Sequence, residues 1–403
     1  MPILQMRIMF MSGSINHNKK LEFIEKELQE RRNNNNLREL NAIYPKDAVT
    51  AIKNGKPLIN FSSNDYLGLS KHPQIITTSQ DYLNRYGTGS TASRLVTGNY
   101  DIHKKLEEKI AKLCGKEAAL LFNTGFQANS TIIPALVNQK SLVLCDRLVH
   151  NSILQGILLS KAQWKRYKHN DLSHLETLLK KAVSQGYNRI LIITETVFSM
   201  EGDRSDVDSL IQLSQQYNTL LYLDDAHALG IMGDKGMGLT AQKPGIDISL
   251  GTFGKAMGSF GAFITTSKLM RDYLINCCPG FIYTTALPPA VIGSIDAAFD
   301  IIPSLDQERE YLLQKVDYLQ NNLRNLGYQV INSSSPIIPV MIGNEKKTLQ
   351  LSQFLEKNGI LATAIRPPTV PQNTARIRLV LSSQHQPEHI NYLIQLLQQY
   401  HES

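Results

Sequence analysis

The chain has 403 residues, of which 42% are hydrophobic and 19% are charged, as in an ordinary globular protein long enough for about two or three domains. Its formal net charge of +7 is scattered among acidic residues, so the clustered basic face of a nucleic-acid-binding protein is missing. A modest positive charge favours an acidic substrate such as a coenzyme A thioester, or an acidic carrier protein. No apolar run approaches the roughly 18 residues of a membrane-spanning helix, so no membrane partner is predicted.

Cysteine usage and the start of the chain bear on the cellular compartment. The cysteines show no C-x-x-C spacing, which indicates neither a zinc site nor a disulfide framework and fits a reducing cytoplasm. The apolar start from Met1 to Met11 carries Arg7 and lacks a small-residue cleavage site, so we expect no signal peptide, and Met11 is an alternative start. The four cysteines are Cys114, Cys145, Cys277 and Cys278.

Two helices are predicted in the first part of the chain. Apolar residues at helical spacing predict an amphipathic helix within residues 20–40, and the run Asn33–Asn36 should form a kink or loop in it. A second helix is expected to begin with Asp101 as its N-cap and to stop at Gly115. The apolar stripes of these helices are Leu21, Ile24 and Leu28, and Ile102, Leu106, Ile110 and Leu113.

Short apolar runs then alternate with helical stretches, notably 171–183 and 206–216. The runs are apolar throughout, as expected for strands buried on both faces of a mostly parallel sheet covered by helices. This pattern predicts an α/β fold whose ligands bind at the carboxyl ends of the strands. The predicted strands are Ala118–Phe122, Leu142–Cys145, Ile190–Thr194, Leu220–Leu223 and Ile248–Thr252.

The pattern changes after Pro288-Pro289, where a long helical region at about 290–326 precedes fewer and shorter elements. These elements indicate a smaller C-terminal α+β domain. They are strands Ile337–Ile342 and Ala375–Leu381, with helices near 346–358 and from about 387. We therefore expect an N-terminal segment with a helix at 1–60, a large cofactor-binding domain at 61–289 and a small domain at 290–403.

Two motifs at the ends of predicted strands suggest the chemistry. Lys255 lies between small residues after one strand, and Asp224 and His227 close another. An amine that binds an aldehyde covalently, with an acid that keeps a pyridine nitrogen protonated, is what pyridoxal phosphate chemistry requires. A phosphate-loop interpretation fails because Ser249 stands where that loop needs glycine and Ala256 where it needs Ser or Thr. The acid and histidine could instead form an ion-pair or metal site, although no further cluster of metal-ligand spacing supports it.

Other candidates each have an ordinary structural alternative. Gly125 opens a helix after a strand, where backbone N–H groups can bind a phosphate or simply form a turn. His150 could stack on a flat cofactor ring or be a buried structural histidine, and Glu195 could cap a helix or pair with a lysine. Arg376 and Arg378 would share one face of a strand, where either could bind a substrate carboxylate or lie exposed at a sheet edge.

Taken together and in order, several stretches resemble the α-oxoamine synthases. These are pyridoxal-phosphate enzymes of the aspartate-aminotransferase fold (fold type I) that condense an amino acid with an acyl thioester and release carbon dioxide. The resemblance runs from about residue 37 to the end of the chain. The stretches that carry it are Asn60–Leu69, Thr194–Asp203, Asp224–His227 and Thr252–Lys255.

One further stretch distinguishes members within the family. Thr363–Pro371, followed by Thr374–Leu379, resembles the biotin-pathway members, which join L-alanine to a pimeloyl thioester of coenzyme A or acyl carrier protein. The alternatives are a glycine- or serine-using synthase and an aminotransferase of the same fold. A catalytically silent scaffold subunit is a third alternative, but such subunits tend to lose the lysine that is present here as Lys255.

The resemblance also implies roles for particular residues, in a cytoplasmic homodimer without a metal. The catalytic residues would be Lys255, which binds the cofactor and moves protons, Asp224 at the ring nitrogen, His227 at the ring oxygen and His150 on the ring face. The cofactor phosphate would be held by Gly125, Phe126 and Thr252, with Thr284 and Thr285 reaching the neighbouring copy's phosphate and Ser199 near the ring. The substrates would be bound by Asn64 and Arg378 at the amino-acid carboxylate and by Arg38 and Thr369 at the acyl chain.

Overall fold

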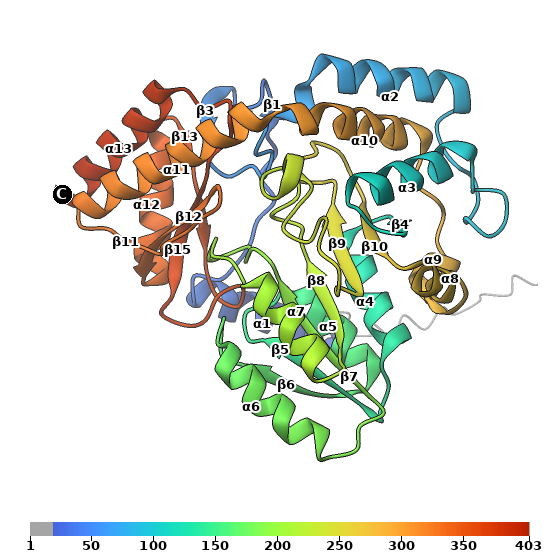
Figure 1. The fold of residues 1–403 in the computed structure, drawn as a ribbon. Helices are drawn as coiled ribbons and strands as arrows, with labels where there is room; N and C mark the ends of the chain where they lie inside the picture. The colour runs from blue at the N-terminus through green and yellow to red at the C-terminus, as the bar shows by residue number, and fades with distance from the viewer. Residues whose placement is uncertain (1–18, 403) are drawn as a thin grey trace, which may run out of the picture.

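The computed structural model describes residues 19–402, so the segment Met1–Met11 lies outside the described residues. A seven-stranded sheet forms its centre (Figure 1). In spatial order the strands are β4 (Ala118–Phe122), β10 (Ala262–Thr266), β9 (Ile248–Thr252), β8 (Leu220–Asp224), β7 (Arg189–Glu195), β5 (Ser141–Asp146) and β6 (Gln163–Tyr167). Neighbouring strands are parallel except around β10, which is antiparallel to both β4 and β9. The predicted α/β fold with a mostly parallel sheet is confirmed.

All five strands predicted before residue 289 are present in this sheet, with ends that differ from the prediction by one residue at most. The sequence pattern did not predict β6 and β10. In β6 only the last residue is buried, so no apolar run marks the strand. β10 is buried throughout, but it is a short strand that ends in two threonines and returns antiparallel beside β9.

Helices cover both faces of the sheet. Successive side chains of each strand point to opposite faces, so strands that are apolar throughout present apolar side chains on both. Side chains of α4 (Gly125–Leu136), α5 (Asn151–Ser160), α8 (Lys268–Cys277) and the short α9 (Pro279–Ile282) pack on one face. The opposite face is covered by α3 (Asp101–Leu113), α6 (Leu172–Val183) and α7 (Val207–Gln216). The predicted helices at 171–183 and 206–216 are thus confirmed as α6 and α7.

Aspartates cap α6 and α7, whereas of the two ends predicted for α3 only the one at Gly115 is confirmed. Asp171 and Asp206 cap α6 and α7 by accepting backbone hydrogen bonds from the third helical residue. The prediction for Asp101 was wrong by one residue, because Tyr100 occupies the N-cap and Asp101 is the first helical residue, where its carboxylate pairs with Lys105 instead. α3 does end before Gly115, whose φ of +65° belongs to the left-handed region that glycine adopts easily.

The region after residue 289 contains two helices where one long helical region was predicted. α10 (Pro289–Ile301) packs on α2 (Pro73–Tyr86), and a 3₁₀ turn over Ile302–Ser304 separates it from α11 (Asp306–Asn325). A second, antiparallel sheet follows, with α12 (Glu345–Lys357) and α13 (Pro387–Glu402) beside it. Its strand order is β11 (Gln329–Val330), β12 (Ile337–Gly343), β15 (Ala375–Val380) and β14 (Thr363–Ile365).

The N-terminal segment contributes α1 (Glu22–Asn33), which ends where the predicted asparagine run begins, and a small sheet. That sheet contains β1 (Tyr44–Pro45), β2 (Thr50–Lys53), β3 (Lys56–Asn60) and β13 (Ile360–Leu361). Because β13 pairs with β3, the N-terminal strands lie against the C-terminal region (Figure 1). The domain limits at 60 and 289 remain predictions. Within residues 19–402 no helix has the length and apolar character needed to cross a membrane.

Candidate active site

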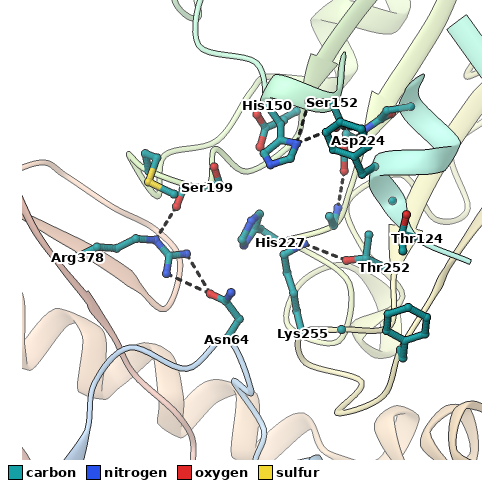
Figure 2. A pocket seen from close by; sticks show the side chains of 18 of the residues that line it. Asn64, Thr124, His150, Ser152, Ser199, Asp224, His227, Thr252, Lys255 and Arg378 are labelled. Atoms are coloured by element: carbon teal, nitrogen blue, oxygen red, sulfur yellow. Dashed lines mark hydrogen bonds between the residues drawn. The ribbon is translucent and has the colours of Figure 1, made fainter. Parts of the chain in front are cut away.

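A cavity of about 530 Å³ opens at the carboxyl ends of the parallel strands. Asp224 is the last residue of β8, Glu195 the last of β7 and Thr252 the last of β9, and all three line the cavity. In Figure 2, Lys255 and Thr252 lie on one side of the cavity and Arg378 lies on the other. The predicted site residues that line the cavity are Asn64, Gly125, Phe126, His150, Ser199, Asp224, His227, Thr252, Lys255 and Arg378.

Lys255 lies in the tight connection between β9 and β10. Its Nζ donates a hydrogen bond to Thr252 Oγ1 over 3.0 Å. The connection is closed by backbone hydrogen bonds from Phe253 to Gly261 and from Gly258 to the Lys255 carbonyl, both 2.9 Å long. Gly258 has a φ of +63°, and a Cβ there would lie 2.4 Å from the Ser70 backbone nitrogen, so the turn requires glycine. Burial lowers the pKa of Lys255, which favours the uncharged, nucleophilic amine.

Asp224 is held by a buried hydrogen-bond network. Its Oδ2 accepts from Asn129 Nδ2 over 2.8 Å, and its Oδ1 accepts from the Ala226 backbone N–H over 3.1 Å. Asn129 is oriented in turn by the hydroxyl of Tyr222, which donates to its Oδ1 over 2.8 Å. Two donors that favour the charged form make Asp224 a suitable carboxylate partner for a cation in the cavity.

His150 caps the start of α5 and lines the cavity. Its Nδ1 accepts from the Ser152 backbone N–H over 3.3 Å and lies 2.7 Å from the Ser152 hydroxyl. Because Nδ1 is an acceptor, the ring proton resides on Nε2 and the ring is neutral. Burial lowers the pKa of His150, which agrees with this neutral ring.

His227 is fixed by Tyr66, whose hydroxyl oxygen lies 2.7 Å from the His227 Nδ1. Burial raises the pKa of Tyr66 to about 12, so the phenol keeps its proton. The only other acceptor near that hydroxyl among the described residues, Asn64 Oδ1 at 3.4 Å, already accepts two hydrogen bonds from Arg378. Tyr66 therefore donates to Nδ1, which leaves Nε2 of His227 as the nitrogen that carries the ring proton. Burial lowers the pKa of His227 well below its usual value, so this ring is neutral too.

The start of α4 offers backbone N–H groups to the cavity. Thr124 is its N-cap, and Gly125 and Phe126 follow along the cavity wall. A Cβ on residue 125 would lie 2.7 Å from Thr252 Cγ2, so glycine allows the helix start to approach β9 closely. A helix N-terminus in this position is suited to bind a phosphate group.

The two arginines of β15 differ in their partners, although both are buried. Arg376 forms an ion pair with Glu201 over 2.9 Å. Arg378 donates to the Ser199 carbonyl over 2.7 Å and to Asn64 Oδ1 through both terminal nitrogens over 3.1 Å (Figure 2). Among residues 19–402 no carboxylate forms an ion pair with Arg378. Its positive charge is therefore available for an anionic ligand in the cavity.

Four of the predicted site residues lie outside this cavity. Thr284 and Thr285 are held by Asn123, whose Nδ2 donates to the Thr284 hydroxyl over 3.0 Å and to the Thr285 carbonyl over 2.9 Å, and Thr284 lines a separate small pocket with Asn123. Arg38 and Thr369 are hydrogen-bonded to each other over 2.8 Å and line a neighbouring groove of about 1030 Å³. The groove shares Ser62, Thr363 and Ile365 with the cavity.

Sequence reasoning missed the residues that support the site. Asn129 and Tyr66 were not predicted, and Glu195 was given no role in the site. A signal for Asn129 was available, because it lies four residues after Gly125 and thus on the same face of α4. The metal alternative for Asp224 and His227 gains no support, since the described residues contain no cluster of His, Cys, Asp and Glu suited to a metal.

Known proteins resemble this chain over most of its length. Residues 56–397 match the family of class I and II aminotransferases. A protein of Desulfosudis oleivorans is 49% identical over 366 residues, 91% of this chain and 95% of that protein, and its name provisionally assigns it as an 8-amino-7-oxononanoate synthase. A structure of serine palmitoyltransferase with pyridoxal phosphate is 25% identical, with a TM-score of 0.88 over 95% of this chain and 98% of that one. The 8-amino-7-oxononanoate synthase of Francisella tularensis is 27% identical, with a TM-score of 0.74 over 86% and 98% of the two chains.

Proposed function

Because the chain belongs to the class I and II aminotransferase family, within which it resembles 8-amino-7-oxononanoate synthases, we propose that it condenses L-alanine with a pimeloyl thioester. The products are 8-amino-7-oxononanoate, a free thiol and carbon dioxide, in biotin biosynthesis. The observation that carries the proposal is the convergence of Lys255, Asp224, His227 and Arg378 on one cavity. The four cysteines are free thiols, which supports a place in the reducing cytoplasm.

The residues of the cavity fit pyridoxal phosphate. Lys255 supplies an amine of lowered pKa for the aldehyde, and Asp224 supplies a carboxylate for the ring nitrogen. The neutral His150 provides a ring face, and the start of α4 with Thr252 provides phosphate donors. When bound, this cofactor supplies an electron sink for the pair left behind when a bond at the Cα of the amino acid breaks.

The protein's own groups position the amino acid and move its protons. The guanidinium of Arg378, oriented by Asn64, binds the carboxylate of alanine and fixes the direction of its Cα–H bond. Nζ of Lys255 removes the Cα proton and later returns a proton to the product, and its lowered pKa favours the uncharged amine that accepts the first proton. The Nε2–H of His227 is suited to hydrogen-bond the ring oxygen of the cofactor.

The groove that adjoins the cavity is suited to the acyl donor. It is larger than the cavity and continuous with it through Ser62, Thr363 and Ile365. Arg38 and Thr369 lie along it, hydrogen-bonded to each other. An arginine beside this larger groove suits a thioester that carries negative charge, whether the carrier is coenzyme A or acyl carrier protein.

The proposal includes a homodimer. The segment with Leu95 and Val96 is tied to the segment with Tyr283 by a β-bridge between Ser93 and Thr285. The side chains of Leu95, Val96 and Tyr283 are all exposed, which is typical of a surface that a partner covers. A second copy here would bring Thr284 and Thr285 near the phosphate of its neighbour.

A thiol-release assay tests the proposed reaction. Wild-type protein with pyridoxal phosphate and a pimeloyl thioester should release thiol with L-alanine, and far less with glycine or L-serine. Lys255→Ala should abolish both thiol release and the visible absorbance of the bound cofactor, while Lys104→Ala, at an exposed helix position, should change neither. Thiol release with glycine but not with alanine would reject the alanine specificity and favour another synthase of the family.

A further inference from the structure

A second carboxyl group lies beside Asp224 in the cavity. Glu195 and Asp224 are paired in register as the last residues of β7 and β8, so both side chains lie on the same face of the sheet. They are 3% and 6% exposed, and both line the cavity. Two buried carboxyl groups this close do not both ionise readily, because each negative charge disfavours the other.

Their hydrogen bonds decide which of the two keeps a proton. Asp224 accepts from Asn129 and from the Ala226 backbone, and both bonds favour its charged form. Oε1 of Glu195 has no hydrogen-bond partner among the described residues, and burial outweighs the His150 backbone N–H and the charge of Lys255, which favour the charged form. Burial, and then the charge of Asp224, raise the pKa of Glu195 well above its usual value.

Two other buried carboxyl groups at this edge of the sheet have hydrogen-bond donors or a positively charged partner. Asp225 accepts from the Thr196 hydroxyl and from the backbone and hydroxyl of Thr240. Glu201 is neutralised by Arg376. Glu195 therefore stands apart as a cavity-lining carboxyl group with an unpartnered oxygen.

We propose that Glu195 is carried through the reaction as a neutral carboxylic acid that donates a hydrogen bond into the cavity and leaves Asp224 as the single carboxylate charge facing the cofactor ring. The proposal rests on the proposed function, because it assigns Glu195 a role toward that cofactor. The charge state of Glu195 also affects Lys255. Burial lowers the pKa of Lys255, and negative charge on Asp224 or Glu195 opposes that change. A neutral Glu195 thus keeps the Lys255 amine easier to deprotonate, as the proton-transfer steps require.

Infrared spectroscopy of the holoenzyme tests the charge state without any turnover. At about pH 8, wild-type protein should show the carbonyl band of a protonated carboxyl group, shifted when glutamate alone carries ¹³C in its side-chain carboxyl. Glu195→Gln should lose this band, and Glu108→Gln, at an exposed residue of α3, should keep it. Absence of a glutamate-derived band in wild-type protein would overturn the proposal even if the variant did not fold.

Two further measurements test the consequences of a neutral donor. The pH midpoint of the bound cofactor's visible absorbance should shift by less than about 0.3 unit in Glu195→Gln, because no charge is removed. A downward shift of about one unit or more would show that Glu195 is ionised. Glu195→Leu, which cannot donate, should be at least about tenfold less active than Glu195→Gln, since a buried group loses its partner.

Equal activity of Glu195→Gln and Glu195→Leu would overturn the proposed hydrogen-bond donation by Glu195.

Failure of the proposed function is distinguishable from failure of this inference. If wild-type protein released no thiol with alanine, the reaction would be wrong, while the infrared band would still report on Glu195.

Discussion

Arg376 and Arg378 lie two residues apart on β15, yet their surroundings give them different tasks. Arg376 binds Glu201, the Met200 carbonyl and the Thr374 carbonyl, so its charge is neutralised within the protein. Arg378 donates hydrogen bonds to a carbonyl and to an amide oxygen, both uncharged. A buried cation without a counter-ion is costly, and the carboxylate of the substrate would remove that cost.

Replacing Arg378 by lysine should impair amino-acid binding more than folding. Arg378→Lys keeps a positive charge but cannot contact Ser199, Asn64 and a carboxylate together, because it lacks the planar fork. Loss of one charge-assisted hydrogen bond, about 1.5–3 kcal/mol, predicts a rise of about 10- to 100-fold in KM for L-alanine. Steady-state kinetics with varied alanine would measure it.

Arg376→Lys is the matched control. It should lower the unfolding midpoint by weakening the buried pair with Glu201, with little change in KM for alanine. If only Arg376→Lys raised the KM for alanine, the roles assigned to Arg376 and Arg378 would be wrong.

Replacing Asp224 by asparagine should slow turnover with little change in the shape of the side chain. The substituted amide keeps the size of the side chain but loses the charge that the Asn129 and Ala226 donors now stabilise. An uncharged group cannot keep the ring nitrogen protonated, so kcat should fall by at least about 100-fold, as for the loss of a main electrostatic contact. Comparison of kcat for Asp224→Asn and wild type, at saturating cofactor, measures the effect; a loss below about tenfold would contradict the assigned role.

At the scale of elements, apolar runs predicted the central strands and therefore the edge where the site lies. The chain positions of Asp224 and Lys255 relative to those runs were sufficient to place both at carboxyl ends of strands. Hydrogen-bond partners distant in sequence were not predictable. Tyr66 reaches His227 and Asn64 reaches Arg378 only through the tertiary fold, and no periodicity records such contacts. For the same reason the unpartnered oxygen of Glu195 is visible only in the structure.

One histidine, in the loop that follows β6, joins the end of β5 to the loop that follows β7. The Nδ1 of His169 lies 3.0 Å from Asp146 Oδ1, and its Nε2 lies 2.9 Å from Asp203 Oδ2. Although burial alone would lower it, the hydrogen bonds to Asp146 and Asp203 raise the pKa of His169 to about 10. Asp203 belongs to the same loop as Ser199, so the charged imidazole helps to fix a loop that borders the cavity.

This bridge predicts a pH-dependent part of the stability. The pKa of His169 is raised from about 6.5 in the unfolded chain, so its stabilising effect is complete below about pH 6.5 and is lost as the pH rises through 10. His169→Asn should lower the free energy of unfolding by about 3 kcal/mol near pH 6, because it leaves two carboxylates unpaired. The difference from wild type should shrink steadily toward pH 10 in urea unfolding.

His401→Asn provides the comparison, since His401 is exposed on α13. Its difference from wild type should be small and constant over the same pH range. If the His169→Asn difference were equally constant, His169 would not be a charged bridge in the folded protein.

At the scale of the whole molecule, the single chain leaves much apolar surface uncovered. No residue of α1 is buried, although Leu21, Phe23, Ile24 and Leu28 lie on or next to it. Phe126 and Phe260 are also exposed, and both border the cavity. Exposed apolar groups around the site fit the proposal that a second copy covers them.

The proposed dimer predicts the molecular mass in solution and a variant that is monomeric. Wild-type protein should have twice the 45.2 kDa mass of the chain by light scattering coupled to size exclusion. Val96→Asp combined with Tyr283→Asp places charges on the proposed interface, where they cannot be solvated, so this variant should be monomeric. Because Thr284 and Thr285 would then be absent from the neighbour's site, the monomer should also bind pyridoxal phosphate more weakly.

Val183→Asp, an equivalent change on the exposed end of α6, should leave the dimer and cofactor binding intact. A double variant that remained dimeric would exclude this surface, and a monomeric wild type that retained full activity would exclude the dimer itself.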